Sequence, residues 1–180
     1  MLELVIPETE QYDEARGCFI TTKEQTLRLE HSLVSLSKWE SKWRKPYLSR
    51  KPKTREEQID YVRCMTLTQH VDPNVYTALT PKLLETVDAY INDPMTATTF
   101  AKGRRGRSAN EIVTAEIIYY WMILHNIPSE YQKWHLNRLM TLINVCNAKN
   151  GPKKKMSQKE IFAQNRALNA ARRKQTHSRG

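Results

Sequence analysis

The sequence predicts a mainly α-helical protein with a small β element at its N-terminus and a basic helical tail at its C-terminus. Glycine is scarce, at 5 of 180 residues, and hydrophobic residues make up 39% of the chain, a composition typical of a helix-rich globular protein. Helix-start signals recur along the chain, whereas strand-like runs are confined to its beginning. We therefore predict a helical domain over residues 1–152, with its β element at 1–31, and a basic helix or tail over 153–180.

The β element is predicted from three short runs with alternating or β-branched residues. The first, "LELVI", ends at Pro7, and "CFITT" (18–22) and "TLRLE" (26–30) follow it. Only the polar residues "KEQ" separate the second and third runs. These two runs are therefore predicted to pair as a short hairpin.

The helices are predicted from capping boxes and from prolines. In a capping box the Ser/Thr side chain accepts the amide hydrogen of the third helical residue, whose Glu/Gln side chain accepts the cap's own amide hydrogen. Such pairs occur at Thr54/Glu57, Ser108/Glu111, Ser129/Gln132 and Ser157/Glu160. Pro73 and Pro81 suit the first turn of a helix, where no amide hydrogen is needed. The predicted helices are 35–45, 54–66, 73–79, 81–92, 108–126, 129–149 and 157–175.

Two of these helices are predicted to form the centre of the core. The segment 108–126 is apolar around nearly its whole circumference, and Trp121 lies in its middle. The segment 129–149 is rich in leucine and isoleucine, and only a short turn separates the two. They are therefore predicted to pack as an antiparallel helical hairpin.

The segment 29–48 carries an aromatic stripe with three possible uses. At helical spacing Leu36, Trp39 and Trp43 fall on one face, with Tyr47 close behind them. The stripe could be core, a platform for stacking nucleic-acid bases beside Lys38 and Lys42, or a surface for another protein. We predict that most of it is buried and that an exposed remainder, drawn from Leu36, Trp39, Trp43 and Tyr47, binds a partner.

The positive charge is concentrated in a tail and a loop. The net charge is +10, residues 153–180 contribute +8 and "KGRRGR" at 102–107 contributes +4, so the rest of the chain is nearly neutral. The loop could be solvated or hold an anion, and the tail could bind nucleic acid or an acidic surface such as residues 1–30 of another copy. The candidate anion-binding residues are Lys102, Arg104, Arg105, Arg107, Lys153, Lys154, Lys155, Arg172, Arg173 and Lys174.

No catalytic, metal or cofactor site is predicted. His125, His135 and Cys146 are too few and too scattered for a zinc site, and no convergent carboxylate pair or phosphate-binding glycine loop is present. The three cysteines form no CxxC pair, and no signal peptide is apparent. The longest apolar run is shorter than the roughly 20 residues that a membrane span requires. We therefore expect a non-enzymatic protein of the cytoplasm, without a membrane segment.

Beyond these patterns, the chain resembles a family of small proteins encoded in the tail-gene clusters of long-tailed bacteriophages. The resemblance covers nearly the whole chain and is carried by five segments. They are "LEHSLVSLSKWESKW", "PYLSRKPKTREEQIDYVRCMTL", "PMTAT", "EIVTAEIIYYWMILHNIPSEYQKWHLNRLMTLINVCN" and "KKMSQKEI…NRALNAARRKQ". It implies a tail assembly chaperone that binds the tape-measure protein in the host bacterial cytoplasm during virion morphogenesis, and no catalytic residues come with it.

The resemblance implies the tape-measure protein as the partner, with the tail-tube protein as a second one, and the charge pattern also allows self-association. Two other functions stay open from the sequence. One is a phage nucleic-acid-binding protein that uses the basic tail. The other is a structural tail or connector subunit whose N-terminal strands join those of its neighbours.

Overall fold

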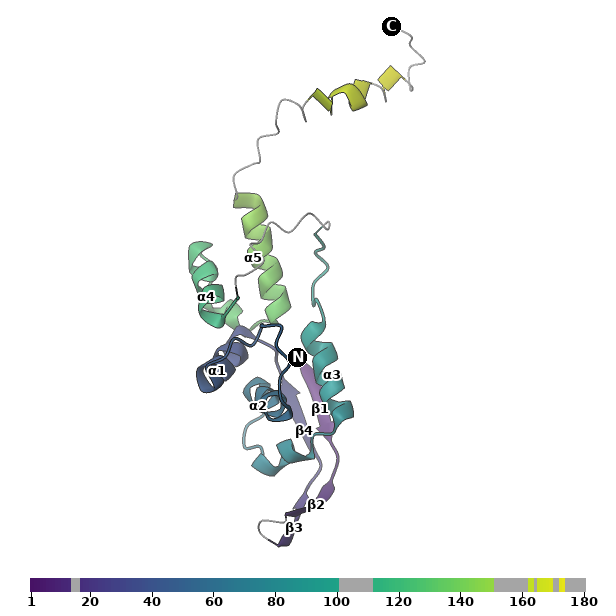
Figure 1. The fold of residues 1–180 in the computed structure, drawn as a ribbon, viewed down its shortest axis with the longest axis vertical. Coiled ribbons are helices and arrows are strands. Elements are labelled where there is room, and N and C mark those ends of the chain that lie inside the picture. Colours follow the sequence, from purple (N-terminus) through teal and green to yellow (C-terminus); the bar gives the residue numbers. More distant parts are fainter. Residues whose placement is uncertain (14–16, 101–111, 151–161, 164, 170–171, 174–180) are drawn as a thin grey trace. The chain divides into compact units, whose positions relative to one another are not determined.

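The protein is mainly α-helical with a small β element at its N-terminus, as the sequence predicted. The computed structural model describes residues 1–13, 17–100, 112–150, 162–163, 165–169 and 172–173. The chain separates into two compact units, Met1–Cys146 and Asn147–Gly180, whereas the predicted boundary lay between residues 152 and 153. Figure 1 shows the elements of the first unit, which carries the surfaces discussed below.

The β element is one antiparallel ribbon built in two sections. The strands are β1 (Leu2–Ile6), β2 (Thr9–Asp13), β3 (Cys18–Thr22) and β4 (Gln25–Leu29). β1 pairs with β4, and β2 pairs with β3. The predicted hairpin between residues 18–22 and 26–30 is therefore wrong, because both runs lie on the same arm of the ribbon. Pro7, which has no amide hydrogen to donate, lies where the first arm is interrupted.

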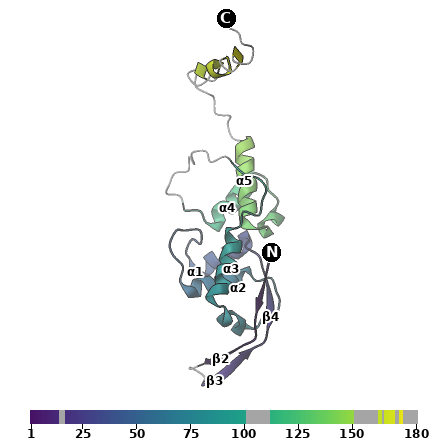
Figure 2. The same ribbon diagram turned by 90° about the vertical axis from the view of Figure 1, so that its right-hand side faces the viewer.

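Alternate residues of β1 and β4 form one wall of the core. Leu4, Ile6, Leu27 and Leu29 are buried, while the residues between them face solvent, as the two-residue period of a strand requires. In Figures 1 and 2 the β1–β4 section lies beside the helices, and the β2–β3 section projects beyond them.

Two capped helices follow the ribbon. In α1 (Leu33–Trp43) Ser32 caps the helix: its Oγ accepts the amide hydrogen of Ser35, and Ser35 Oγ accepts that of Ser32. This cap starts the helix two residues before the predicted position 35. In α2 (Arg55–Met65) the predicted box of Thr54 and Glu57 is confirmed, with distances of 3.3 and 2.8 Å.

The next two helices begin at prolines, as predicted. A 3-10 helix, η1, spans Pro73–Ala78, and α3 spans Pro81–Asn92. Asp72 and Thr80 precede these prolines and accept backbone amide hydrogens of the first turns. Both starts thus combine a polar cap with a proline at the first helical position.

The centre of the core lies between α1, α2 and the β1–β4 section. The side chains of Trp39, Tyr61, Leu36 and Met65 are at most 1% exposed. Trp39 Nε1 donates a hydrogen bond of 2.9 Å to the carbonyl of Glu57, so the two helices are joined by a polar contact as well as by packing. This centre replaces the helical hairpin that the sequence suggested.

The predicted central helix 108–126 is shorter and more peripheral than expected. The observed helix, α4, spans Ala115–Leu124, and the predicted cap pair Ser108/Glu111 falls outside the described residues. The carboxylate of Glu40, on α1, accepts the amide hydrogens of Ala115 at 2.7 Å and of Tyr47 at 2.8 Å. Because an anion stabilises a helix N-terminus, this contact attaches the start of α4 to α1.

α4 ends in a Schellman motif. Asn126 adopts the left-handed conformation at φ 52°, and its amide hydrogen bonds to the carbonyl of Ile123. The amide of Ile127 donates to the carbonyl of Met122 at 2.8 Å. The chain therefore turns sharply where the sequence placed the connection between two helices.

The predicted helix 129–149 is divided into two. A 3-10 helix, η2, covers Ser129–Lys133, and α5 covers Leu136–Asn150. Ser129 makes no capping hydrogen bond, so this predicted cap is wrong. The break occurs because His135 forms an isolated β-bridge with Ser32, and Leu136 donates its amide hydrogen to the carbonyl of His31 at 2.7 Å.

Candidate binding surface

The aromatic stripe predicted to bind a partner is mostly interior. Leu36 and Trp39 are buried, and Tyr47 is 8% exposed. The Tyr47 ring stacks on Tyr61 with centroids 3.8 Å apart and meets Trp39 edge-on at 5.0 Å. The predicted burial of most of the stripe is therefore confirmed, and these three side chains fill the space between α1 and α2.

Trp43 is the member of the stripe that stays partly exposed, as the sequence expected for one of the two tryptophans. Its ring stacks on Trp39 with centroids 6.0 Å apart, and its Nε1 donates to Asp60 at 2.8 Å. Lys42 and Lys45 lie over the ring, with Nζ 6.0 and 5.5 Å from its centroid. One face and the polar edge of Trp43 are thus occupied, which leaves little of it for stacking a nucleic-acid base.

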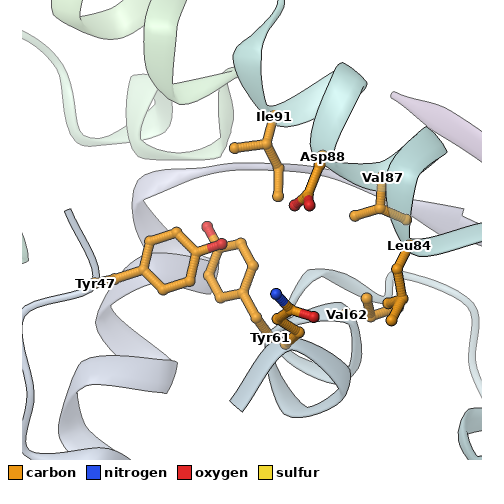
Figure 3. A pocket seen from close by; sticks show the side chains of 8 residues that line it. Tyr47, Tyr61, Val62, Leu84, Val87, Asp88 and Ile91 are labelled. Atoms are coloured by element: carbon orange, nitrogen blue, oxygen red, sulfur yellow. The ribbon is translucent and has the colours of Figure 1, made fainter. Parts of the chain in front are cut away.

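A small hollow lies between α2 and α3, beside the stacked pair of Tyr47 and Tyr61 (Figure 3). Asp88 and Ile91 point into it from α3. Burial raises the pKa of both tyrosines, so their hydroxyls stay protonated at neutral pH. Partial burial also raises the pKa of Asp88, and Lys53 opposes this. The hollow has room for little more than a water molecule, so we assign it to packing rather than to ligand binding.

Two buried histidines connect the ribbon, α2 and the start of α5. His31 Nδ1 and the Tyr61 hydroxyl share a hydrogen bond of 2.6 Å, and the ring of His135 lies 5.2 Å from that of His31. His135 Nε2 donates to the carbonyl of Tyr90, while its Nδ1 accepts the amide hydrogen of Asn137. With one nitrogen donating and the other accepting, His135 is the neutral tautomer.

The environment of these histidines disfavours protonation. Burial and the neighbouring His135 lower the pKa of His31 from 6.5 to about 3, and burial lowers the pKa of His135. Within the described residues no group of three His, Cys, Asp or Glu side chains is placed to hold a metal ion, and Cys64 and Cys146 are free thiols. The histidine pair therefore serves the packing of the core.

One face of α4 is an exposed apolar feature. Ile118 and Met122 are buried, but Tyr120, Ile123 and Leu124 are 60, 75 and 57% exposed. These three positions follow the spacing i, i+3, i+4 and form one stripe on the helix. We call Tyr120, Ile123 and Leu124 the α4 stripe. The acidic side chains of Glu116 and Glu130 are exposed before and after it along the chain.

The sequence did not predict this stripe, because apolar residues around a whole helix indicate a buried helix. A helix that is apolar all round is usually enclosed on all sides. In α4, however, the side of Ala115, Ile118 and Met122 is buried, and Tyr119 and Trp121 pack against the core only in part. The adjacent tyrosines at 119 and 120 were the available signal, since a tyrosine tolerates partial exposure better than an aliphatic side chain does.

A second exposed apolar feature lies on the projecting section of the ribbon. Tyr12 and Phe19 are opposite each other in the β2–β3 register, with ring centroids 5.1 Å apart. They are 56 and 66% exposed. Such a cross-strand aromatic pair stabilises the ribbon and also presents apolar area to solvent.

Most of the predicted anion-binding residues lie outside the described part of the chain. These are Lys102, Arg104, Arg105, Arg107, Lys153, Lys154, Lys155 and Lys174. Arg172 and Arg173 lie in a short helical stretch and are exposed. The described residues thus bring together no anion site from this set.

Comparisons with protein-family models, with curated proteins and with solved structures find no match for this chain. Its function therefore has to be inferred from the chemistry of its surfaces. None of the helices in the described segments combines the length and the hydrophobicity that a membrane span requires.

Proposed function

We propose that this chain is a tail assembly chaperone of a long-tailed bacteriophage, which binds the tape-measure protein in the host cytoplasm while the tail is built. The family resemblance of the sequence suggests this role, and the α4 stripe is the observation that supports a protein-binding one. The chain then acts by covering a partner, without a catalytic step and without a cofactor.

The α4 stripe suits a helical partner. Its three side chains lie along a helix of ten residues, which is about 15 Å long. An amphipathic helix presents apolar residues at the same spacing, so the two stripes can pack side by side. Burying a large apolar side chain contributes about 1.5–3 kcal/mol, and three partly exposed ones supply a useful share of a binding free energy.

The charges around the stripe add a preference. Because Glu116 and Glu130 are exposed on either side of it along the chain, a partner helix with basic residues flanking its apolar stripe is favoured. A long tape-measure helix with exposed apolar stripes would aggregate before the tail tube forms around it. A chaperone that covers those stripes prevents this.

Substitution of Ile123 tests the proposal. Ile123→Gln should leave the fold intact, because the side chain is 75% exposed, and should weaken binding to a fragment of the tape-measure protein from the same phage. A loss of about 2 kcal/mol, or roughly thirtyfold in Kd, is typical of an interface hot spot. The measurement is titration calorimetry with the purified fragment, together with the fraction of the fragment that stays soluble on co-expression.

Leu67→Gln is the matched control, because Leu67 is an apolar residue that is 57% exposed outside α4. It should bind the fragment like the unchanged protein. Equal binding by the Ile123 variant would contradict the proposed surface. Failure of the wild-type protein to bind any tape-measure fragment would contradict the proposed function. Presence of the protein in purified virions at the copy number of a structural subunit would favour a tail or connector subunit.

A further inference from the structure

Residues 38–63 form a positively charged surface. The distribution of charge along the sequence did not predict it, because the segment contains acids as well as bases. This segment contains nine lysines and arginines and four acids. Three of the acids, Glu40, Glu57 and Asp60, are buried, whereas Glu56 is exposed. Eight of the nine bases are exposed, and Lys53 is half-buried. The exposed side chains of this segment therefore carry a larger net positive charge than a count of all its charged residues gives.

Each buried acid is directed toward groups of the fold rather than toward solvent. Glu40 accepts two backbone amide hydrogens. Glu57 binds Lys45 at 2.6 Å and closes the α2 capping box. Asp60 binds Lys42 and the indole of Trp43. These contacts neutralise Lys42 and Lys45 in part, and Asp60 also pairs with Arg63 at 3.5 Å.

Six of the nine bases make no salt bridge within the described residues. Two of the six are otherwise engaged, since Lys53 lies over the Tyr47 ring and Arg55 donates to the Leu79 carbonyl. The remaining four are Lys38, Arg44, Arg50 and Lys51. Lys38 lies in the middle of α1, Arg44 caps the C-terminal end of that helix, and the other two lie on the connection to α2. Six residues of helix separate Lys38 from Arg44, which is about 9 Å along the axis. We call these four residues the α1–α2 basic surface.

The chemistry around these cations suits a phosphate backbone better than a protein. A stable protein interface needs an apolar centre. Between residues 38 and 63, all of which the structure describes, Leu48 is the one large apolar side chain with a high exposure, at 41%. Phosphate groups require only positive charge and hydrogen-bond donors, and arginine and lysine supply both.

We infer that the α1–α2 basic surface binds the phosphate backbone of a nucleic acid, without reading its base sequence. Trp43 does not serve as a stacking platform in this complex, because Trp39, Lys42 and Lys45 surround it. The surface is distinct from the α4 stripe, so this binding is independent of the proposed tape-measure contact.

The test is a titration of the full chain with fluorescent single-stranded DNA, RNA and duplex DNA of about 20 nucleotides, longer than one single-strand binding site. The triple variant Lys38→Gln, Arg50→Gln, Lys51→Gln removes three of the four cations. It should weaken binding by at least about tenfold at 100 mM salt. Its slope of log K against log salt should fall by about 2, since each lost single-strand phosphate contact removes about 0.7.

Two further variants keep the net charge equal to that of the first. Lys23→Gln, Lys82→Gln, Lys133→Gln removes three exposed cations elsewhere in the first unit, and should change the affinity by less than about twofold. The second variant removes three cations from the tail: Lys153→Gln, Lys154→Gln, Lys155→Gln. It measures how much the tail contributes to the affinity. A melting temperature equal to that of the unchanged chain confirms that each variant folds.

Three results would overturn the inference. The first is a Kd of the wild-type chain above about 10⁻⁴ M for every probe at physiological salt, which is the weak end of non-specific binding. The second is a loss of affinity in the first triple variant no larger than in the Lys23, Lys82 and Lys133 variant. The third is equally tight binding of a labelled poly-glutamate peptide of matched charge, lost in the same variant, which would assign the surface to an acidic protein.

Discussion

At the scale of single residues, Trp39 and Trp121 differ in burial in a way that the sequence did not predict. Trp39 is 1% exposed, packs against Tyr47 and Tyr61 and donates a hydrogen bond to α2. Trp121, which the sequence placed at the centre, is only partly buried at the edge of the core. Burial therefore depends on which neighbours the fold supplies and not on the apolar character of the local segment.

Substitution of the two residues should reveal this difference. Trp39→Ala should lower the free energy of unfolding by about 3–5 kcal/mol, because it opens a cavity between α1 and α2 and leaves the Glu57 carbonyl without its indole donor. Trp121→Ala should cost less, since part of that ring already faces solvent. Urea denaturation of both variants is the measurement, and a larger loss for Trp121→Ala would return α4 to the centre of the core.

At the scale of elements, capping signals were informative only where the tertiary structure allowed a helix to start. The Thr54/Glu57 pair caps α2, but Ser129 is followed by a short 3-10 helix and caps nothing. The difference lies in His135, whose β-bridge with Ser32 holds the chain extended before α5. A local pattern cannot report a pairing with a residue about a hundred positions away.

The two candidate caps provide a matched test. Thr54→Ala should lower the free energy of unfolding by about 1 kcal/mol, because the amide of Glu57 loses its acceptor. Ser129→Ala should change it by less than about 0.5 kcal/mol, since Ser129 is exposed and makes no capping bond. Thermal and urea denaturation of the two variants distinguish these outcomes. Equal losses would show that Ser129 caps a helix in solution.

At the scale of the whole first unit, the histidine pair connects segments that are distant in the chain. His31 follows the ribbon and shares a hydrogen bond with Tyr61 on α2, while His135 precedes α5 and donates to the carbonyl of Tyr90 on α3. Glu30 and Asp93 lie near enough to favour protonation of His135, but burial outweighs them. Both rings are neutral in the folded protein. Acid, which favours their protonated forms, should therefore lower the stability of the protein.

The stability of the protein should therefore fall as the pH drops below about 6.5. The unfolded chain binds a proton at His31 near its ordinary pKa of 6.5, whereas the folded chain does so only near 3. The free energy of unfolding is then lost progressively from about pH 6.5 down to about pH 3. His31 alone accounts for about 2 kcal/mol between pH 7 and pH 5, and His135 adds to it.

Urea denaturation at several pH values measures this dependence. His31→Gln keeps a polar partner for the Tyr61 hydroxyl and should show a shallower decline between about pH 7 and pH 5. His70→Asn is the control, because His70 is exposed and its left-handed backbone suits asparagine. An unchanged pH dependence in the His31 variant would contradict the assignment.

The sequence by itself determined the fold class, the starts of α2 and α3 and most of the helix-forming segments. It could do so because caps, prolines and apolar periodicity act within a few residues. It also established that Trp39 and Trp43 share a face, although not which of them is buried. The strands at 2–6, 18–22 and near 26–30 followed from local composition, but their pairing did not.

The tertiary structure alone decided which surfaces are exposed. The apolar side chains of the α4 stripe face solvent because the buried side of that helix is the one with Ala115, Ile118 and Met122, and no local pattern records where a neighbouring helix lies. The α1–α2 basic surface exists because the fold buries Glu40, Glu57 and Asp60 and leaves nearby cations outside. Composition counts these charges equally, whereas a ligand meets only those at the surface.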